Sequence, residues 1–306
     1  MGRSAGGPGP VQLSGVSNVP LADLYAPVPA RRRGRIAALG GSIAAVGAAA
    51  VAGLFVVGSP ATPAVAQVLS RGASNTLSAG SMRISMTVNE RVQRAAGPDV
   101  QVSITSQGVT DRLHKQADLT EQIGGYGALE IRQVGNLLYL HLPANLPTRV
   151  PTPWASVEVP ATPASGSSSL YDPVGQLQSL TGSGFASSVT NLGTEAVDGV
   201  QTTHYHAVLN PSAVLGAASA NPLLGPVNLS QVDITTLTAD MWIDAGGLAR
   251  RFVSRIALYP TGQTAAGVTA TITLHLYDFG VAVSVQPPPA SQVTPVGNLT
   301  QVLGTA

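Results

Sequence analysis

Apolar and polar residues alternate strictly along several stretches of this chain, and this pattern constrains the fold more than any other feature. Over residues 82–89 every even-numbered side chain is apolar, and the same holds over residues 268–277. Side chains two residues apart point to the same face of a β-strand, so each stretch has one apolar face. The alternation predicts antiparallel strands with one face buried.

About ten such stretches follow one another, and short turn signals such as Gly135-Asn136 and Asp198-Gly199 join several of them. Direct succession of strands through short turns is typical of a meander and not of a chain that alternates strands with helices. The predicted strands cover residues 82–89, 100–104, 109–119, 128–134, 137–142, 186–196, 200–209, 232–244, 250–259 and 268–277.

Helices are predicted at only three places. Apolar residues at helical spacing predict one over residues 64–78. Asp172-Pro173 and Asn210-Pro211 each place a capping residue before a proline, which favours two further short helices. Three short helices cannot cover the apolar face of ten strands. The sheet therefore either closes on itself around a solid core or curls around the helices and leaves an apolar cavity.

The composition excludes several function classes. The chain has 306 residues, no cysteine and a formal charge of +1. Without cysteine it has no disulfide framework, no thiolate zinc site and no cysteine nucleophile. The balanced charge gives no basic surface of the kind that binds nucleic acid. We therefore expect no nucleic-acid partner.

Four arginines, at positions 31, 32, 33 and 35, precede a stretch without any charged residue, 36–58. A basic flank before an uncharged stretch of this length predicts a membrane-targeting segment with its N-terminus inside. We expect a retained single-pass anchor, with cleavage after Ala66 as the alternative, because Ala64-Val65-Ala66 resembles a signal-peptidase site. The predicted parts are a polar tail over 1–35, the anchor or signal core over 36–58, an extracytoplasmic domain over 64–285 and an extended tail over 286–306.

Candidate catalytic and metal-binding residues are few. His204 and His206 share one strand face, as some zinc sites require, but a third ligand would have to be His275 or Asp240 from elsewhere. We interpret the pair as a polar, solvent-facing strand surface and predict no metal and no cofactor.

The remaining polar candidates also favour structural roles. Ser183 lacks the surroundings of a nucleophile elbow. Asp240 and Asp244 would lie about 13 Å apart along a strand, too far for paired acid–base work. We expect both carboxylates to be solvated and Trp242 to pack under a loop, with stacking on a sugar as the alternative. We expect Arg250 and Arg251 to lie on a hairpin surface, with contact to an anionic lipid head group as the alternative. No catalytic residue is predicted.

An ordered set of short motifs resembles the actinobacterial envelope lipoprotein family that includes LppX and LprG, which is similar in fold to LolA lipoprotein carriers. No single motif is specific, but the set spans about residues 65–290. The matching pieces are the opening Val68–Val88, the strand 135–140, Thr152-Pro153-Trp154, Tyr171-Asp172-Pro173, the segment 197–205, Met241–Asp244, Leu248–Arg251, Tyr277–Gly280 and Pro287–Pro289.

The resemblance implies an α+β fold, with a strongly curved antiparallel half-barrel of about ten strands and a few short helices on its concave apolar face. It also implies a non-enzymatic protein of the cell envelope that binds or carries lipid or glycolipid acyl chains. The alternative is an envelope-stress sensor or regulatory domain of the same fold. In either role the protein could work with an envelope transporter or regulator.

One departure is that the chain lacks the lipid-modified cysteine of that family. The expected cavity lining consists of the apolar strand positions Ile84, Met86, Val88, Val102, Ile104, Leu138, Leu140, Leu237, Met241, Ile243, Ile272, Leu274 and Leu276.

Overall fold

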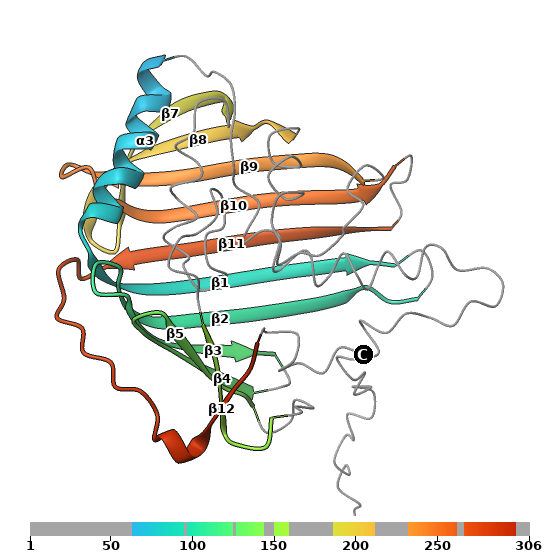
Figure 1. Cartoon of the computed structure of the whole chain (residues 1–306). Helices are drawn as coiled ribbons and strands as arrows, with labels where there is room; N and C mark the ends of the chain where they lie inside the picture. The colour runs from blue at the N-terminus through green and yellow to red at the C-terminus, as the bar shows by residue number, and fades with distance from the viewer. Residues whose placement is uncertain are drawn as a thin grey trace, which may run out of the picture.

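Twelve strands form one open, curved sheet in the computed structural model of the chain (Figure 1). The structure describes residues 63–94, 97–124, 127–143, 150–158, 186–211, 232–261 and 266–297. In these residues the elements are α3 (Pro63–Ser78), β1 (Ser81–Gln93), β2 (Val100–Asp111), β3 (Gln116–Ile123), β4 (Gly127–Val134), β5 (Leu137–His141), β6 (Trp154–Glu158), β7 (Ala186–Val197), β8 (Val200–Leu209), β9 (Val232–Asp244), β10 (Ala249–Pro260), β11 (Gly267–Tyr277), the short 3₁₀ helix η3 (Ala290–Gln292) and β12 (Val293–Pro295).

The strand order is β12-β6-β5-β4-β3-β2-β1-β11-β10-β9-β8-β7. All neighbouring strands are antiparallel except β12, which pairs with β6 in parallel. The meander predicted from the sequence is therefore confirmed, with one long-range closure in its middle, where β11 pairs with β1. That pairing joins the two halves of the sheet, since β1–β6 and β12 lie on one side of it and β7–β11 on the other.

The strand prediction over residues 109–119 was wrong. The chain turns between β2 and β3, with Lys115 at a φ of 53° and the amide of His114 donating to Oδ1 of Asp111 at 3.1 Å. Leu113 lies in this turn and is 72% exposed. Because it is apolar and has the same parity as Val109 and Leu119, the apolar pattern of the sequence continued across the turn. The strand predicted over 82–89 was too short, because Glu90 interrupts the apolar pattern while β1 continues to Gln93.

Two strands were not predicted, and they raise the count from about ten to twelve. β6 and β12 are five and three residues long, too short for a pattern of alternation. Their pairing places Val293 opposite Trp154, so part of the segment predicted to be an extended tail joins the sheet. The two helices predicted after Asp172-Pro173 and after Asn210-Pro211 lie outside the described residues, apart from Asn210 and Pro211 themselves.

One face of the sheet carries most of the apolar core, and α3 packs against it. We call this side of the sheet the concave face. Ile84, Leu274 and Phe252 lie on it and are 0–2% exposed, and the α3 residues Leu69 and Ala73 belong to the same cluster. In Figure 1, α3 runs across one end of the strands from β7 towards β1.

A buried threonine fixes α3 to the sheet. The hydroxyl of Thr76 donates to the carbonyl oxygen of Gly72 at 2.6 Å and accepts from the amide of Ala249 at 2.8 Å. Gly72 lies so close to the sheet that a Cβ atom would come within 2.6 Å of Cδ1 of Ile243. The absence of a side chain at this position allows the helix to approach the strands closely.

No helix within the described ranges is both long enough and apolar enough to span a membrane. The predicted anchor or signal core over 36–58 lies outside those ranges.

Candidate functional site

The thirteen residues predicted to line a cavity share the concave face. The register shows this directly: Met86 lies opposite Leu274, and Val88 lies between Ile272 on β11 and Ile104 on β2. Twelve of the thirteen belong to the apolar cluster or pack against it, while Val102 is half-buried outside it. The structure brings these side chains together on one surface, and their role in ligand binding stays a prediction.

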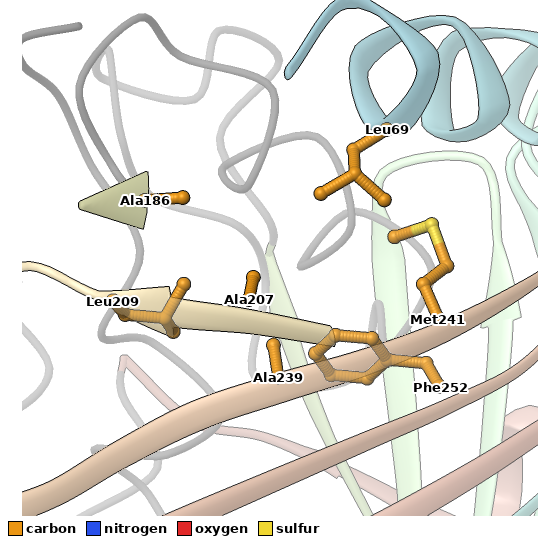
Figure 2. A pocket seen from close by; sticks show the side chains of 7 residues that line it. All are labelled: Leu69, Ala186, Ala207, Leu209, Ala239, Met241 and Phe252. Carbon is orange, nitrogen blue, oxygen red and sulfur yellow. The ribbon is translucent and has the colours of Figure 1, made fainter. Parts of the chain in front are cut away.

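A small apolar pocket lies between α3 and the sheet (Figure 2). In the figure Leu69 approaches from the helix, while the other side chains belong to β7, β8, β9 and β10. The pocket has a volume of about 10 Å³, room for about one water-sized sphere. Its lining consists of Leu69, Ala186, Ala207, Leu209, Ala239, Met241 and Phe252.

Of these seven residues the sequence prediction named only Met241. Three of the others are alanines, and two of them, Ala207 and Ala239, lie directly opposite each other on β8 and β9. Small side chains opposite each other leave a depression in a packed face. The alanines are visible in the sequence as small residues within strands. That they lie opposite each other follows only from the pairing of β8 with β9.

The concave face also carries buried polar side chains. Glu90 is 4% exposed and Ser254 is 1% exposed. Within the described part of the chain, Oε1 of Glu90 and Oγ of Ser254 have no hydrogen-bond partner. Burial raises the pKa of Glu90 to about 8 and that of the half-buried Glu121, which lies on the same face of β3, to about 7. At neutral pH, Glu90 is therefore mainly uncharged.

The opposite, convex face carries the two candidate histidines. Nε2 of His204 and Nδ1 of His206 lie 3.0 and 2.8 Å from the same oxygen of Asp240, and Nη1 of Arg255 lies 2.5 Å from the other. Burial acts to raise the pKa of Asp240, but its hydrogen bonds with His206, His204 and Arg255 outweigh that effect and hold it below the ordinary value. This carboxylate joins β8, β9 and β10.

The prediction that Asp240 and Asp244 are solvated was wrong. Both side chains are only 7% exposed, and Asp244 accepts from Nε of Arg250 at 2.6 Å. The prediction failed because it considered each strand alone, whereas the partners of Asp240 come from the two neighbouring strands. Each of the two carboxylates thus has partners of its own.

Trp242 packs between side chains of the sheet and not under a loop as predicted. Its ring stacks on His204 at 4.1 Å between centroids, and the Arg251 guanidinium lies 4.7 Å from its centre. Its Nε1 donates to Glu195 at 2.9 Å. Since Trp242 is only 5% exposed, its ring faces are already occupied and are not available to stack on a sugar.

No group of three or more His, Asp or Glu side chains within the described ranges is arranged to hold a metal ion. His275, considered as a third ligand, lies 3.0 Å from Asp198 instead of joining His204 and His206. Ser183 lies outside the described residues.

Comparison with known proteins finds similarity in structure only. No family model matches the sequence, and no curated protein matches it. Among solved structures, lipoprotein LppX from Mycobacterium tuberculosis is 14% identical over 73% of this chain and 99% of its own, with a TM-score of 0.44. LprF from Mycobacterium bovis is 18% identical over 76% and 99%, with a TM-score of 0.40.

A LolA superfamily protein from Nitrosomonas europaea is 8% identical over 69% of this chain and 90% of its own, with a TM-score of 0.24. These identities and TM-scores carry no statement about the function of this chain. The chain itself forms the open, mostly antiparallel curved sheet that a half-barrel of this kind requires.

Proposed function

We propose that the protein binds or carries lipids in the cell envelope and shelters their acyl chains against the concave face. The observation that carries this proposal is the width of the apolar surface. It continues across neighbouring strands from β5 to β8, whereas α3 crosses only one end of them. Its side chains are buried, so an acyl chain would bind among them, as ligands do in apolar pockets, and not on an exposed patch.

The energetics of such binding are favourable without a charged anchor. Each methylene group moved from water to an apolar surface contributes about 0.8 kcal/mol, so a ten-carbon chain gains about 8 kcal/mol before the cost of ordering it. The pocket of about 10 Å³ is too small for such a chain as it stands. We therefore propose that an acyl chain enters where the pocket lies and displaces α3 from the sheet.

A tryptophan introduced into the pocket tests this route. Ala239 is 5% exposed and lines the pocket, so Ala239→Trp should fill the entry site and reduce binding of a pyrene-labelled diacylglycerol at least tenfold. The matched control is Thr236→Trp, at an exposed position of the same strand. Fluorescence titration of both variants measures the effect. Unchanged binding by Ala239→Trp would contradict the proposed route, and no binding by the wild type would contradict the proposed function.

We also propose that the domain lies outside the cytoplasmic membrane and that residues 36–58 anchor it there. Support comes from the four arginines before this uncharged stretch. The expected mature protein retains residues 31–58, and peptide mapping of protein isolated from cells identifies its N-terminus. A mature chain that begins at Gln67 would instead show cleavage and free secretion.

A further inference from the structure

We infer that Glu90 and Ser254 form a hydrogen-bonding site on the concave face for the polar part of an uncharged, ester-linked lipid. This inference rests on the proposed function and specifies the class of its ligand. It starts from two polar side chains that are buried in an otherwise apolar surface. Buried polar groups in folded proteins nearly always have hydrogen-bond partners, so two without one on the same face require an explanation.

Glu90 is surrounded by apolar side chains. Val88 and Val92 flank it on the same face of β1, and the register places Val102 and Ala270 opposite it on β2 and β11. None of these side chains can donate to or accept from the carboxyl group. With 4% exposure and no hydrogen-bond partner for Oε1 within the described residues, the group is placed to interact with a molecule bound on this face.

Ser254 connects this position to the pocket. It lies opposite Ala239 and two residues after Phe252, and both of these line the pocket. Two strands and two residues along the sheet separate it from Glu90, a distance of about 12 Å from standard strand spacings. A lipid with a chain in the pocket could therefore place its polar part along the face between the two side chains.

The charges on the face specify the kind of polar group. At the described concave positions of β1, β2, β3 and β11, and of β10 from Phe252 onward, there is no lysine or arginine, and the acidic residues are Glu90 and Glu121. Arg250, at the start of β10, is paired with Asp244. A phosphate or carboxylate would find no cation there and would lie near carboxyl groups. An ester carbonyl is uncharged and accepts one hydrogen bond readily.

The protonation state of Glu90 matches such an acceptor. Because burial raises its pKa to about 8, the carboxyl group carries a proton at neutral pH and donates to a carbonyl oxygen. The Ser254 hydroxyl is a donor at any pH. Both groups therefore favour a lipid whose linkage offers a carbonyl oxygen as acceptor.

The experiment compares lipids that differ in one feature each, either the linkage of the chains or the charge of the polar part. Dioleoylglycerol, its dioleyl ether counterpart and dioleoyl phosphatidate are each used to displace a pyrene-labelled diacylglycerol from the full-length protein at pH 6.5. One hydrogen bond to the ester carbonyl should favour the ester over the ether about fivefold to tenfold. The phosphatidate should bind more weakly than the uncharged ester.

Three variants assign the preference to the site. Glu90→Leu should reduce the preference for the ester, because only the Ser254 hydroxyl remains to donate, whereas Glu90→Gln keeps a donor and should retain the preference. Glu121→Leu is the matched control, because it removes the other glutamate of this face, and should also retain the preference. Equal binding of ester and ether by the wild type, or a preference of the same size in wild type and Glu90→Leu, would overturn the inference. Failure of every probe to bind the wild type would overturn the proposed function and this site with it.

Discussion

Replacing Glu90 by glutamine should make the protein markedly more stable at pH 9 while changing its stability little at pH 5. The ordinary pKa of the side chain is 4.5, and burial raises it to about 8 in the folded protein. Between these values the folded protein holds a proton that the unfolded chain has released, so the free energy of unfolding falls as the pH rises. The difference amounts to at most about 5 kcal/mol, and Glu90→Gln removes it.

Urea unfolding at pH 5, 7 and 9 measures this effect. Glu121→Gln serves as the comparison, because the pKa of Glu121 rises only to about 7 and its contribution should be smaller and complete at lower pH. If wild type and Glu90→Gln lose stability in parallel between pH 5 and 9, Glu90 is ionised in the folded protein. The hydrogen-bond donor proposed for the ligand would then be absent.

Truncating Phe252 should have the second large effect. The ring is 2% exposed and forms one wall of the pocket. Phe252→Ala should lower the free energy of unfolding by about 3–5 kcal/mol and leave an enlarged apolar cavity under α3. Decane should bind in that cavity and restore part of the loss, because a ligand that binds only the folded state stabilises it.

The control for this variant is the next residue. Val253 is 1% exposed but lies on the convex side, in a separate cluster with Val197 and Trp242. Val253→Ala should be destabilised as well, by less because fewer atoms are removed, and decane should not rescue it. Thermal unfolding of both variants with and without decane gives the comparison. Equal rescue of the two would mean that the pocket is not the site of binding.

The alternation of apolar and polar residues made part of the fold predictable from the sequence, namely which face of a strand each side chain occupies. The even-numbered positions of β1 and β11 could be assigned to one face without a structure, and the register confirms this placement. Alternation gives the face of each residue but not its neighbours on other strands. For that reason the contact of Asp240 with His204 and His206 could be considered but not predicted.

The same limit explains what was missed at the candidate site. The strand prediction ended at Asn89 because a carboxyl group at position 90 contradicts an apolar face. In the structure Glu90 continues that face and is buried in it. A rule based on hydrophobicity ends a strand where a polar group enters the apolar surface. Glu90, the proposed hydrogen-bond donor to a lipid, was therefore left out of the strand that the alternation predicted.

The open sheet has consequences for how the protein avoids self-association. A sheet that does not close exposes the backbone groups of two edge strands, which another chain can extend. Here one edge, β12, is three residues long and ends in Pro295, which has no amide hydrogen to donate. The other edge, β7, has irregular pairing between Asn191 and Gly193, where the asparagine side chain accepts from the glycine amide at 2.8 Å. Both edges are thus poor templates for a further strand, so the sheet can remain unclosed without growing into an aggregate.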